Sequence, residues 1–257
     1  MPDRSPRRNG KPSHEQHTPG LLRYRFSPDP EQLVQPELRD EHTERLEQAL
    51  RAIWETPGQV RYPPITPETL TNWHRRLLLG LEPDDRVGHF RTYKEQSSCE
   101  VWEEAEDGSD DEPRHCVCPG VEVPALGDQK IWEVVREACS TFESSVKAQQ
   151  RAQSRKINDA VRPCAKLYVA LLKARPFSID NDPVAYLVLH GAYLRTGLQP
   201  LIYSPRMPTV AETSAEQDVE RVAINLDFNH ALARSLQPNG DDLDQLVAFL
   251  ATHASFR

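Results

Sequence analysis

The stretch between residues 161 and 197 constrains the fold of this chain more than any other. Apolar residues recur at helical spacing on both sides of a short polar loop: Val161, Cys164, Tyr168, Leu171 and Leu172 before it, and Val184, Leu187, Val188, Gly191 and Leu194 after it. Such spacing puts the apolar side chains on one face of each helix. The sequence therefore predicts two buried helices joined by a loop.

Residues 180–183 predict where the second of these helices begins. Asp182 can cap the helix with its carboxylate, and Pro183 suits the first helical position because its missing N–H would have no partner there. Gly197 marks the end of the helix. The free N–H groups at such a helix start suit a phosphate group, so the loop before it is a candidate site.

The rest of the chain shows the same alternation of helical stretches and breaks. Further helices are predicted over residues 40–57, 66–80, 131–142, 211–236 and 241–251. Residues 99–103 and 114–118 alternate in polarity on either side of an acidic turn at 106–113, which predicts a β-hairpin. We therefore predict a mainly α domain that carries one short hairpin.

Composition sets the domain boundary and excludes several classes of protein. Residues 1–39 are rich in Pro, Arg, Ser and His, which predicts a disordered basic tail before a domain at 40–257. No run of 18 apolar residues is present, so no membrane span is predicted. The net charge of −8 argues against a general nucleic-acid partner. The five scattered cysteines predict reduced thiols and a cytoplasmic location.

The order of these segments resembles that of the Fic/Doc (Fido) family over residues 66–200. Residues 73–81 and 87–92 are similar to the family's early helix and its Gly-x-Phe-Arg stretch. The predicted hairpin at 99–118 stands where the family has a substrate-positioning flap, and residues 118–124 are similar to the segment that opens the next helix. The resemblance implies a Fido-like helical domain with flanking helices on both sides.

The family motif, His-x-Phe-x-(Asp/Glu)-(Gly/Ala)-Asn-(Gly/Lys)-Arg, aligns with residues 175–183. Phe177 and Asn181 match it. The departures are Arg175 at the general base, Ile179 at the metal-binding acid, Asp180 at the small residue and Pro183 at the phosphate-binding arginine. The resemblance thus implies a site whose usual reactive groups are replaced.

These replacements predict that AMP transfer by the family's usual route is altered or lost. Arg175 stays protonated and cannot act as a general base, and losing such a base typically removes about 10²–10⁴-fold in rate. Asp180 and Asp182 would each repel a phosphate by about 1 kcal/mol at 4 Å in water. A divalent ion between the two carboxylates would reverse that repulsion.

The candidate site has three groups of residues. Arg175 and Asp180 occupy the degenerate catalytic positions, Phe177, Asn181 and Asp182 are candidates for nucleotide binding, and Asp180 and Asp182 are candidates for a metal. An active protein would be a nucleotidyl- or phosphotransferase that uses Mg²⁺ with ATP or another nucleotide. Its acceptor would be a hydroxyl of a protein or a small molecule.

Two alternatives remain open. In the first, the chain is an inactive Fido-fold interaction module, a pseudoenzyme that binds a partner peptide by strand pairing at the flap. In the second, it is an unrelated helical domain whose motif match is accidental.

Other features favour ordinary structural roles. Residues 43–47 match most of the family's inhibitory helix pattern, but Gln48 departs from it and an exposed helix face is the preferred interpretation. A zinc site or simple hairpin packing would each explain Cys99, His115, Cys116 and Cys118, and packing is favoured because the spacing is unusual for zinc. We also predict packing roles for His74, His190, Cys139 and Cys164.

Overall fold

The computed structural model describes part of the chain. The described residues are 39–55, 62–91, 98–99, 102–103, 116–117, 121–122, 131–153, 156–199, 228, 231–232, 234–236 and 243–256. The predictions for residues 1–38, for the acidic turn at 106–113 and for most of the helix at 211–236 lie outside these residues, as do the side chains of the suggested zinc set.

Helices make up most of the described chain, which confirms the mainly α class. The helices are α2 (Arg39–Trp54), α3 (Pro67–Leu78), α4 (Ile131–Ala152), α5 (Ile157–Ala174), α6 (Asn181–Thr196) and α8 (Asp244–Thr252). The strands are β1 (Ser98–Cys99), β2 (Trp102–Glu103), β3 (Cys116–Val117) and β4 (Val121–Glu122). Within the described residues, no helix has the length and apolar character needed to cross a bilayer.

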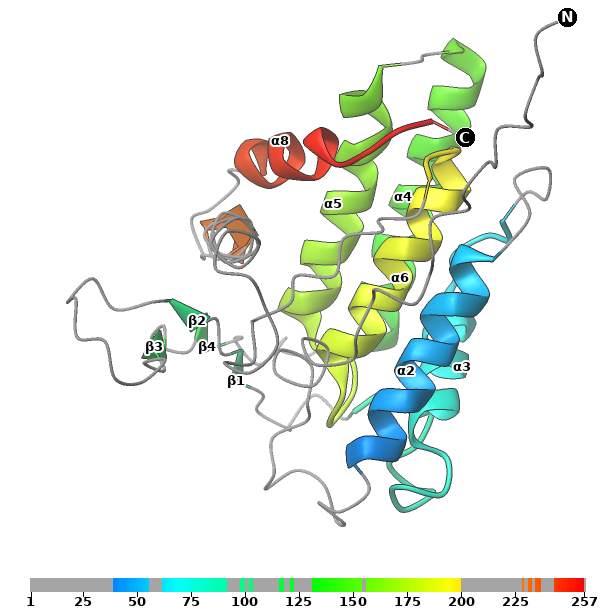
Figure 1. Cartoon of the computed structure of the whole chain (residues 1–257), viewed down its shortest axis with the longest axis vertical. Coiled ribbons are helices and arrows are strands. Elements are labelled where there is room, and N and C mark those ends of the chain that lie inside the picture. Colours follow the sequence, from blue (N-terminus) through cyan, green and yellow to red (C-terminus); the bar gives the residue numbers. More distant parts are fainter. Residues whose placement is uncertain are drawn as a thin grey trace, which may run out of the picture.

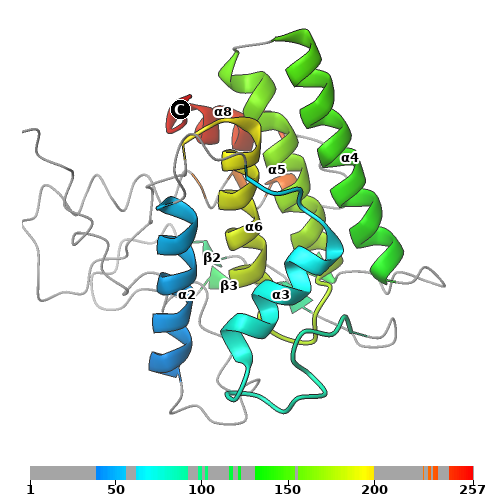
Figure 2. The same ribbon diagram turned by 90° about the vertical axis from the view of Figure 1, so that its right-hand side faces the viewer.

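The two helices predicted around the polar loop, α5 and α6, lie at the centre of the fold. They run side by side, and α5 also contacts α4 and α8 (Figure 1). On its other side α6 contacts α2 and α3 (Figure 2). This arrangement surrounds α6 with neighbours, so nearly all of its residues are buried.

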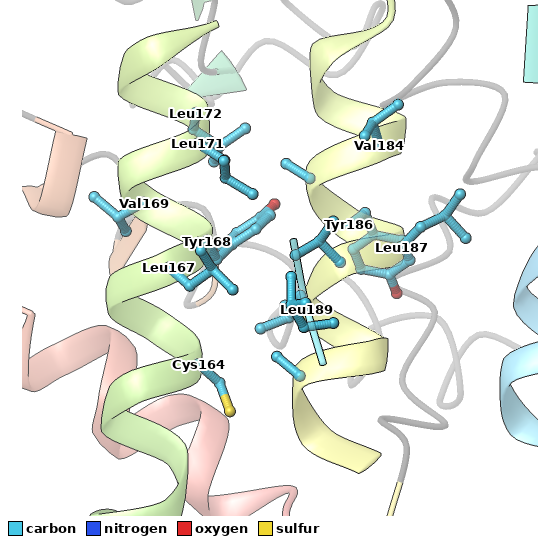
Figure 3. Close-up of a cluster of buried hydrophobic side chains, with 14 of the residues drawn as sticks. Cys164, Leu167, Tyr168, Val169, Leu171, Leu172, Val184, Tyr186, Leu187 and Leu189 are labelled. Carbon is cyan, nitrogen blue, oxygen red and sulfur yellow. The ribbon is translucent and has the colours of Figure 1, made fainter. Parts of the chain in front are cut away.

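Side chains from α5 and α6 fill the space between these helices. Tyr168 of α5 and Leu189 of α6 lie in this space (Figure 3), and both are 1% exposed. Tyr168 belongs to the apolar stripe that the sequence shows before the loop, whereas Leu189 lies outside the predicted stripe and is buried because α6 has neighbours on several sides. Burying one side chain of this size contributes roughly 1.5–3 kcal/mol, so this interface is a main source of stability.

The predicted hairpin is present as short antiparallel pairs. Trp102 pairs with Val117 and Glu103 with Cys116, as expected for the stretches at 99–103 and 114–118. A second pair joins β1 to β4, with Cys99 opposite Val121. The pairing therefore extends four residues past the predicted end of the hairpin.

The start of α3 follows the sequence signal closely. Thr66 is the N-cap, its hydroxyl accepts a hydrogen bond from the backbone N–H of Thr69, and the Thr69 hydroxyl accepts one from the N–H of Thr66. Pro67 is in the first turn. These contacts satisfy N–H groups that a helix start leaves without partners.

The start of α6 differs from the prediction that Asp182 caps it and Pro183 takes its first position. The helix begins at Asn181, with Asp180 as the N-cap in a left-handed conformation (φ 61°, ψ 27°) and no capping bond from its side chain. The Asn181 side chain forms hydrogen bonds with the backbone of Phe177, and the helix begins two residues before the predicted first position. Pro183 is still tolerated because the N–H groups of the first turn have no helical partner.

Gly191 lies inside α6 where the Tyr62 ring packs against the helix. A Cβ atom at this position would be 2.9 Å from Tyr62 Cε1 and 3.1 Å from its hydroxyl oxygen. Tyr62 is only 8% exposed, which limits its room to move. The glycine is therefore required by a close approach between a ring and a helix.

Replacing Gly191 with alanine should lower the free energy of unfolding by up to about 2 kcal/mol. Alanine gains up to about 1 kcal/mol in helix propensity, but overpacking a filled core costs about 1–3 kcal/mol. Urea denaturation measures the difference. In a Tyr62→Ala background the same replacement should be neutral or stabilising, and an equal loss in both backgrounds would show that the ring is not the cause.

Candidate functional site

The candidate site is the loop at residues 175–180, between the end of α5 and the start of α6. Arg175 ends α5 in a left-handed conformation (φ 39°, ψ 67°). The Arg91 side chain donates from Nε to the carbonyl oxygen of Arg175 and from Nη2 to that of Ala174, the latter at 3.0 Å. The backbone N–H of Arg91 also donates to the carbonyl of Pro176, at 2.8 Å. Arg91 therefore fixes the path of the chain as it leaves α5.

Phe177 anchors the middle of the loop in the core. Its side chain is fully buried and stacks on the His74 ring, with centroids 4.0 Å apart and an interplanar angle of 11°. The Phe90 ring lies against the same phenyl group, with centroids 5.2 Å apart. These contacts hold the loop close to α3 and to the segment that follows it.

His74 supports the loop as a neutral, hydrogen-bonded ring. Its Nδ1 accepts a hydrogen bond from the backbone N–H of Gly88 at 2.8 Å, so the ring proton is on Nε2, which lies 3.3 Å from the carbonyl oxygen of Ile179. Burial lowers the pKa of His74 to about 4, against the weaker opposing attraction of Asp180. The contacts agree with the packing role predicted for this residue.

Asn181 closes the loop on itself. Its Oδ1 accepts a hydrogen bond from the N–H of Phe177 at 2.8 Å, and its Nδ2 donates to the carbonyl of Phe177 at 2.9 Å. The residue is 3% exposed. Its amide is thus engaged in positioning the loop backbone, while the role in nucleotide binding proposed for Phe177 and Asn181 stays a prediction.

Asp180 is buried and paired with a histidine from α2. His42 Nε2 lies 2.9 Å from Asp180 Oδ2, and the two side chains are 2% and 0% exposed. Burial alone would lower the pKa of His42, but the negative charge of Asp180 and the hydrogen bond to it outweigh burial and raise that pKa. The other oxygen, Oδ1, is buried without a hydrogen-bond partner among the described residues.

Arg175, the residue at the position of the family's general base, lies beside the first turn of α6. Its Nη1 is 3.5 Å from Asp182 Oδ1, and the side chains are 9% and 36% exposed. The cation therefore partly offsets the negative charge that Asp182 brings to the helix start. This contact brings together two of the predicted site residues.

The predicted divalent ion stays a prediction, and the two carboxylates proposed to hold it have partners within the chain. Asp180 directs one oxygen to His42, whereas Asp182 faces the Arg175 guanidinium, which would repel a metal cation. A Mg²⁺ site needs oxygen ligands in near-octahedral geometry. In the part of the chain that the structure describes, no three His, Cys, Asp or Glu side chains gather in a way that could hold a metal.

Sequence reasoning placed the loop but missed two of its partners. His42 is 138 residues from Asp180 and Arg91 is 84 residues from Arg175, so no spacing in the sequence connects them. Arg91 did belong to the Gly-x-Phe-Arg stretch, which was a signal for its region but not for its contacts. His42 had no such signal.

Three other residues predicted to pack in the core are buried. Cys139 and Cys164 are 3% and 0% exposed, and burial raises the pKa of each thiol to about 12, so both stay protonated. His190 is 0% exposed, and burial lowers its pKa to about 3. Its ring meets Tyr186 edge-on, with centroids 4.6 Å apart. Neutral, buried groups of this kind suit packing.

Comparison with known proteins gave matches among solved structures only. No protein-family model matches the sequence, and no curated protein matches it. Fic-1 from C. elegans (residues 134–508, E274G) is 17% identical with a TM-score of 0.48, over 84% of this chain and 48% of that one. This chain thus spans about half the length of the C. elegans structure.

Two further solved structures cover similar shares of the chain. BepC from Bartonella tribocorum, a VirB-translocated effector solved with AMPPNP bound, is 14% identical with a TM-score of 0.46, over 85% of this chain and 89% of that one. A Fic domain containing signaling protein from Bacteroides thetaiotaomicron is 13% identical with a TM-score of 0.41, over 85% and 68%.

Proposed function

We propose that this chain is a divergent Fido-type protein in which the loop at 175–183 no longer performs the family's usual AMP transfer. The proposal rests on one observation: the polar side chains of the loop are engaged by the chain itself. Arg175 pairs with Asp182, Asp180 with His42, and the Asn181 amide with the backbone of Phe177. A nucleotide would have to compete with each of these contacts.

The chemistry of the loop supports the same proposal. Transfer of AMP to a hydroxyl needs a group that removes the hydroxyl proton, and the guanidinium of Arg175 has no lone pair for that purpose at any useful pH. The nearby His74 has a lowered pKa, but its two ring nitrogens are hydrogen-bonded to Gly88 and Ile179. It therefore serves the loop backbone.

Calorimetric titration with ATP, with and without Mg²⁺, tests this proposal on the full chain. We expect no Mg²⁺-dependent heat, and no label transferred to the chain or to added protein from ATP labelled at the α-phosphate. A known Fido AMP-transferase, treated identically, is the positive control. Circular dichroism must show that the chain is folded.

The result that would contradict the proposal is Mg²⁺-dependent binding of ATP through the loop. Mg²⁺-dependent ATP binding that is lost in Asp182→Asn would assign a working metal and phosphate role to this carboxylate and would overturn the proposal. Asp182 suits this test because it is 36% exposed, so its replacement disturbs the core little. The double variant with Asp180→Asn would then test the predicted metal pair.

A second candidate function, a peptide-binding module, is favoured by the strand pairs. β2 pairs with β3 and β1 with β4, and in each two-stranded sheet an edge can accept a further extended segment. We propose that a partner peptide would add to such an edge. The N–H groups of Cys116 and Val117 point in opposite directions, so one of them faces the outer edge of β3. Peptides selected for binding should lose affinity in Cys116→Pro or Val117→Pro, and unchanged affinity in both variants would place them elsewhere.

A further inference from the structure

The contact between His42 and Asp180 joins two residues that lie 138 positions apart in the sequence. His42 belongs to the first turn of α2, and Asp180 is the N-cap of α6 at the end of the loop. Both side chains are almost completely buried. A polar contact made away from water carries a large penalty when one partner is removed.

Asp180 holds a backbone conformation that is costly for its residue type. Its φ of 61° lies in the left-handed region, which costs about 1–2 kcal/mol for residues with a side chain. Aspartate often offsets this cost by bonding locally, for example by capping the helix it precedes. Here the side chain makes no capping bond, and its carboxylate binds α2 instead.

α2 docks on the rest of the molecule through one buried face, so its docking depends on this contact. One face of α2 is buried, through Leu46, Ala49, Leu50 and Ile53, while Glu41, Glu44, Gln48 and Arg51 are exposed. The helix packs chiefly on α6 and α3 (Figure 2). Arg45 of the same helix donates from Nη1 to the carbonyl oxygens of Leu79, at 2.6 Å and exposed to water, and of Leu77, at 3.4 Å and partly buried.

We propose that α2 acts as a strap over the loop, and that the His42–Asp180 contact couples the docking of α2 to the left-handed turn at Asp180. With α2 docked, the carboxylate has a partner and the turn is held. With α2 released, the turn loses that partner, and a buried carboxylate remains whose Oδ1 already has none among the described residues. This coupling is independent of whether the loop binds a nucleotide.

Hydrogen–deuterium exchange measured by mass spectrometry on the full chain tests the coupling in both directions. His42→Ala should speed exchange not only in α2 but also across residues 177–182, by roughly tenfold or more, the size expected for a lost hydrogen bond to a charged group. Asp180→Ala should do the same to α2, 138 residues away in sequence.

A glycine variant separates the effect of the His42–Asp180 contact from that of the strained backbone at position 180. Asp180→Gly removes the carboxylate but takes the left-handed conformation at no steric cost. It should therefore speed exchange in α2 and leave residues 177–182 close to wild type. Arg45→Ala, which removes the contacts of α2 with the carbonyls of Leu77 and Leu79, should leave exchange in the loop unchanged.

Two results would overturn the proposal. One is His42→Ala exchanging at wild-type rates across residues 177–182, and the other is Asp180→Gly leaving α2 as protected as before. If His42→Ala does not fold, His42→Gln keeps an N–H donor and should show a smaller effect in both segments. A change confined to α2 in that variant would count against the coupling equally.

Discussion

Replacing Arg195 with alanine should lower the free energy of unfolding by about 3–5 kcal/mol, the usual cost of removing one partner of a buried ion pair. Arg195 lies near the end of α6 and binds Glu143 of α4, with Nε 3.1 Å from both carboxylate oxygens and Nη2 2.7 Å from Oε2. The two side chains are 6% and 13% exposed. The variant would leave the Glu143 carboxylate with little access to water.

The same pair also holds the segment before α3. Arg195 Nη1 donates to the carbonyl of Tyr62 at 3.3 Å, and Glu143 Oε1 accepts from the N–H of Ile65 at 2.9 Å. Burial alone would raise the pKa of Glu143, but its hydrogen bonds from Arg195 and Ile65 outweigh burial and lower that pKa. Loss of Arg195 therefore affects α4, α6 and the segment at 62–66 together.

Urea denaturation of Arg195→Ala and Arg162→Ala compares the stability lost with a buried ion pair and the stability lost with an exposed one. Arg162 Nη2 is 2.6 Å from Asp244 Oδ1, a similar separation, but those side chains are 47% and 74% exposed. Exposed pairs contribute about 0–1 kcal/mol, so Arg162→Ala should stay within that range. Equal losses in the two variants would contradict the role that we assign to burial.

Mild acid should destabilise the chain steeply, by about 2.5 kcal/mol when the pH falls from 6.0 to 5.0. Burial lowers the pKa of His74 to about 4 and that of His190 to about 3. In the unfolded chain both would titrate near 6.5. The unfolded state therefore binds up to two more protons in this range, so stability is fully present above about pH 6.5 and is lost as the pH falls.

Replacing His190 with leucine should roughly halve this slope, because one of the two titrating groups is gone. The measurement is the free energy of unfolding at several pH values between 6.0 and 5.0. The quantity to compare between the variant and the wild type is the change in this free energy with pH, not its absolute value. His42 acts in the opposite sense: its raised pKa contributes stability below about pH 6.5 that is lost at higher pH. A slope unchanged in His190→Leu would show that His190 is not the titrating group.

Local sequence signals predicted the helices well. The capping residues at Thr66 and Gly197 behave as expected, and the stripe that begins at Ile131 continues through Val146, which is why α4 runs to Ala152 rather than ending near residue 142. Periodicity and caps act over a few residues, so they are visible without a structure.

The candidate site was located by sequence but its contacts were not. The motif alignment placed the loop at 175–183, yet the start of α6 was predicted two residues late because the bonds between Asn181 and Phe177 had no periodic signal. The His42 and Arg91 contacts join residues far apart in the chain. Only packing brings such partners together, so they need three-dimensional information.

The Arg91 contacts have a consequence for how freely the end of α5 can change. Arg91 donates hydrogen bonds to the carbonyl oxygens of Ala174, Arg175 and Pro176, two from its side chain and one from its backbone N–H. The acceptor in each of these three bonds is a backbone atom. Every amino acid carries the same backbone carbonyl, so these hydrogen bonds do not depend on the side chain of the acceptor residue. Residues that tolerate the left-handed φ of 39° at position 175 should therefore keep the route of the chain and change only the side chain displayed there, whereas Ala174 is 3% exposed and has no room for a larger side chain.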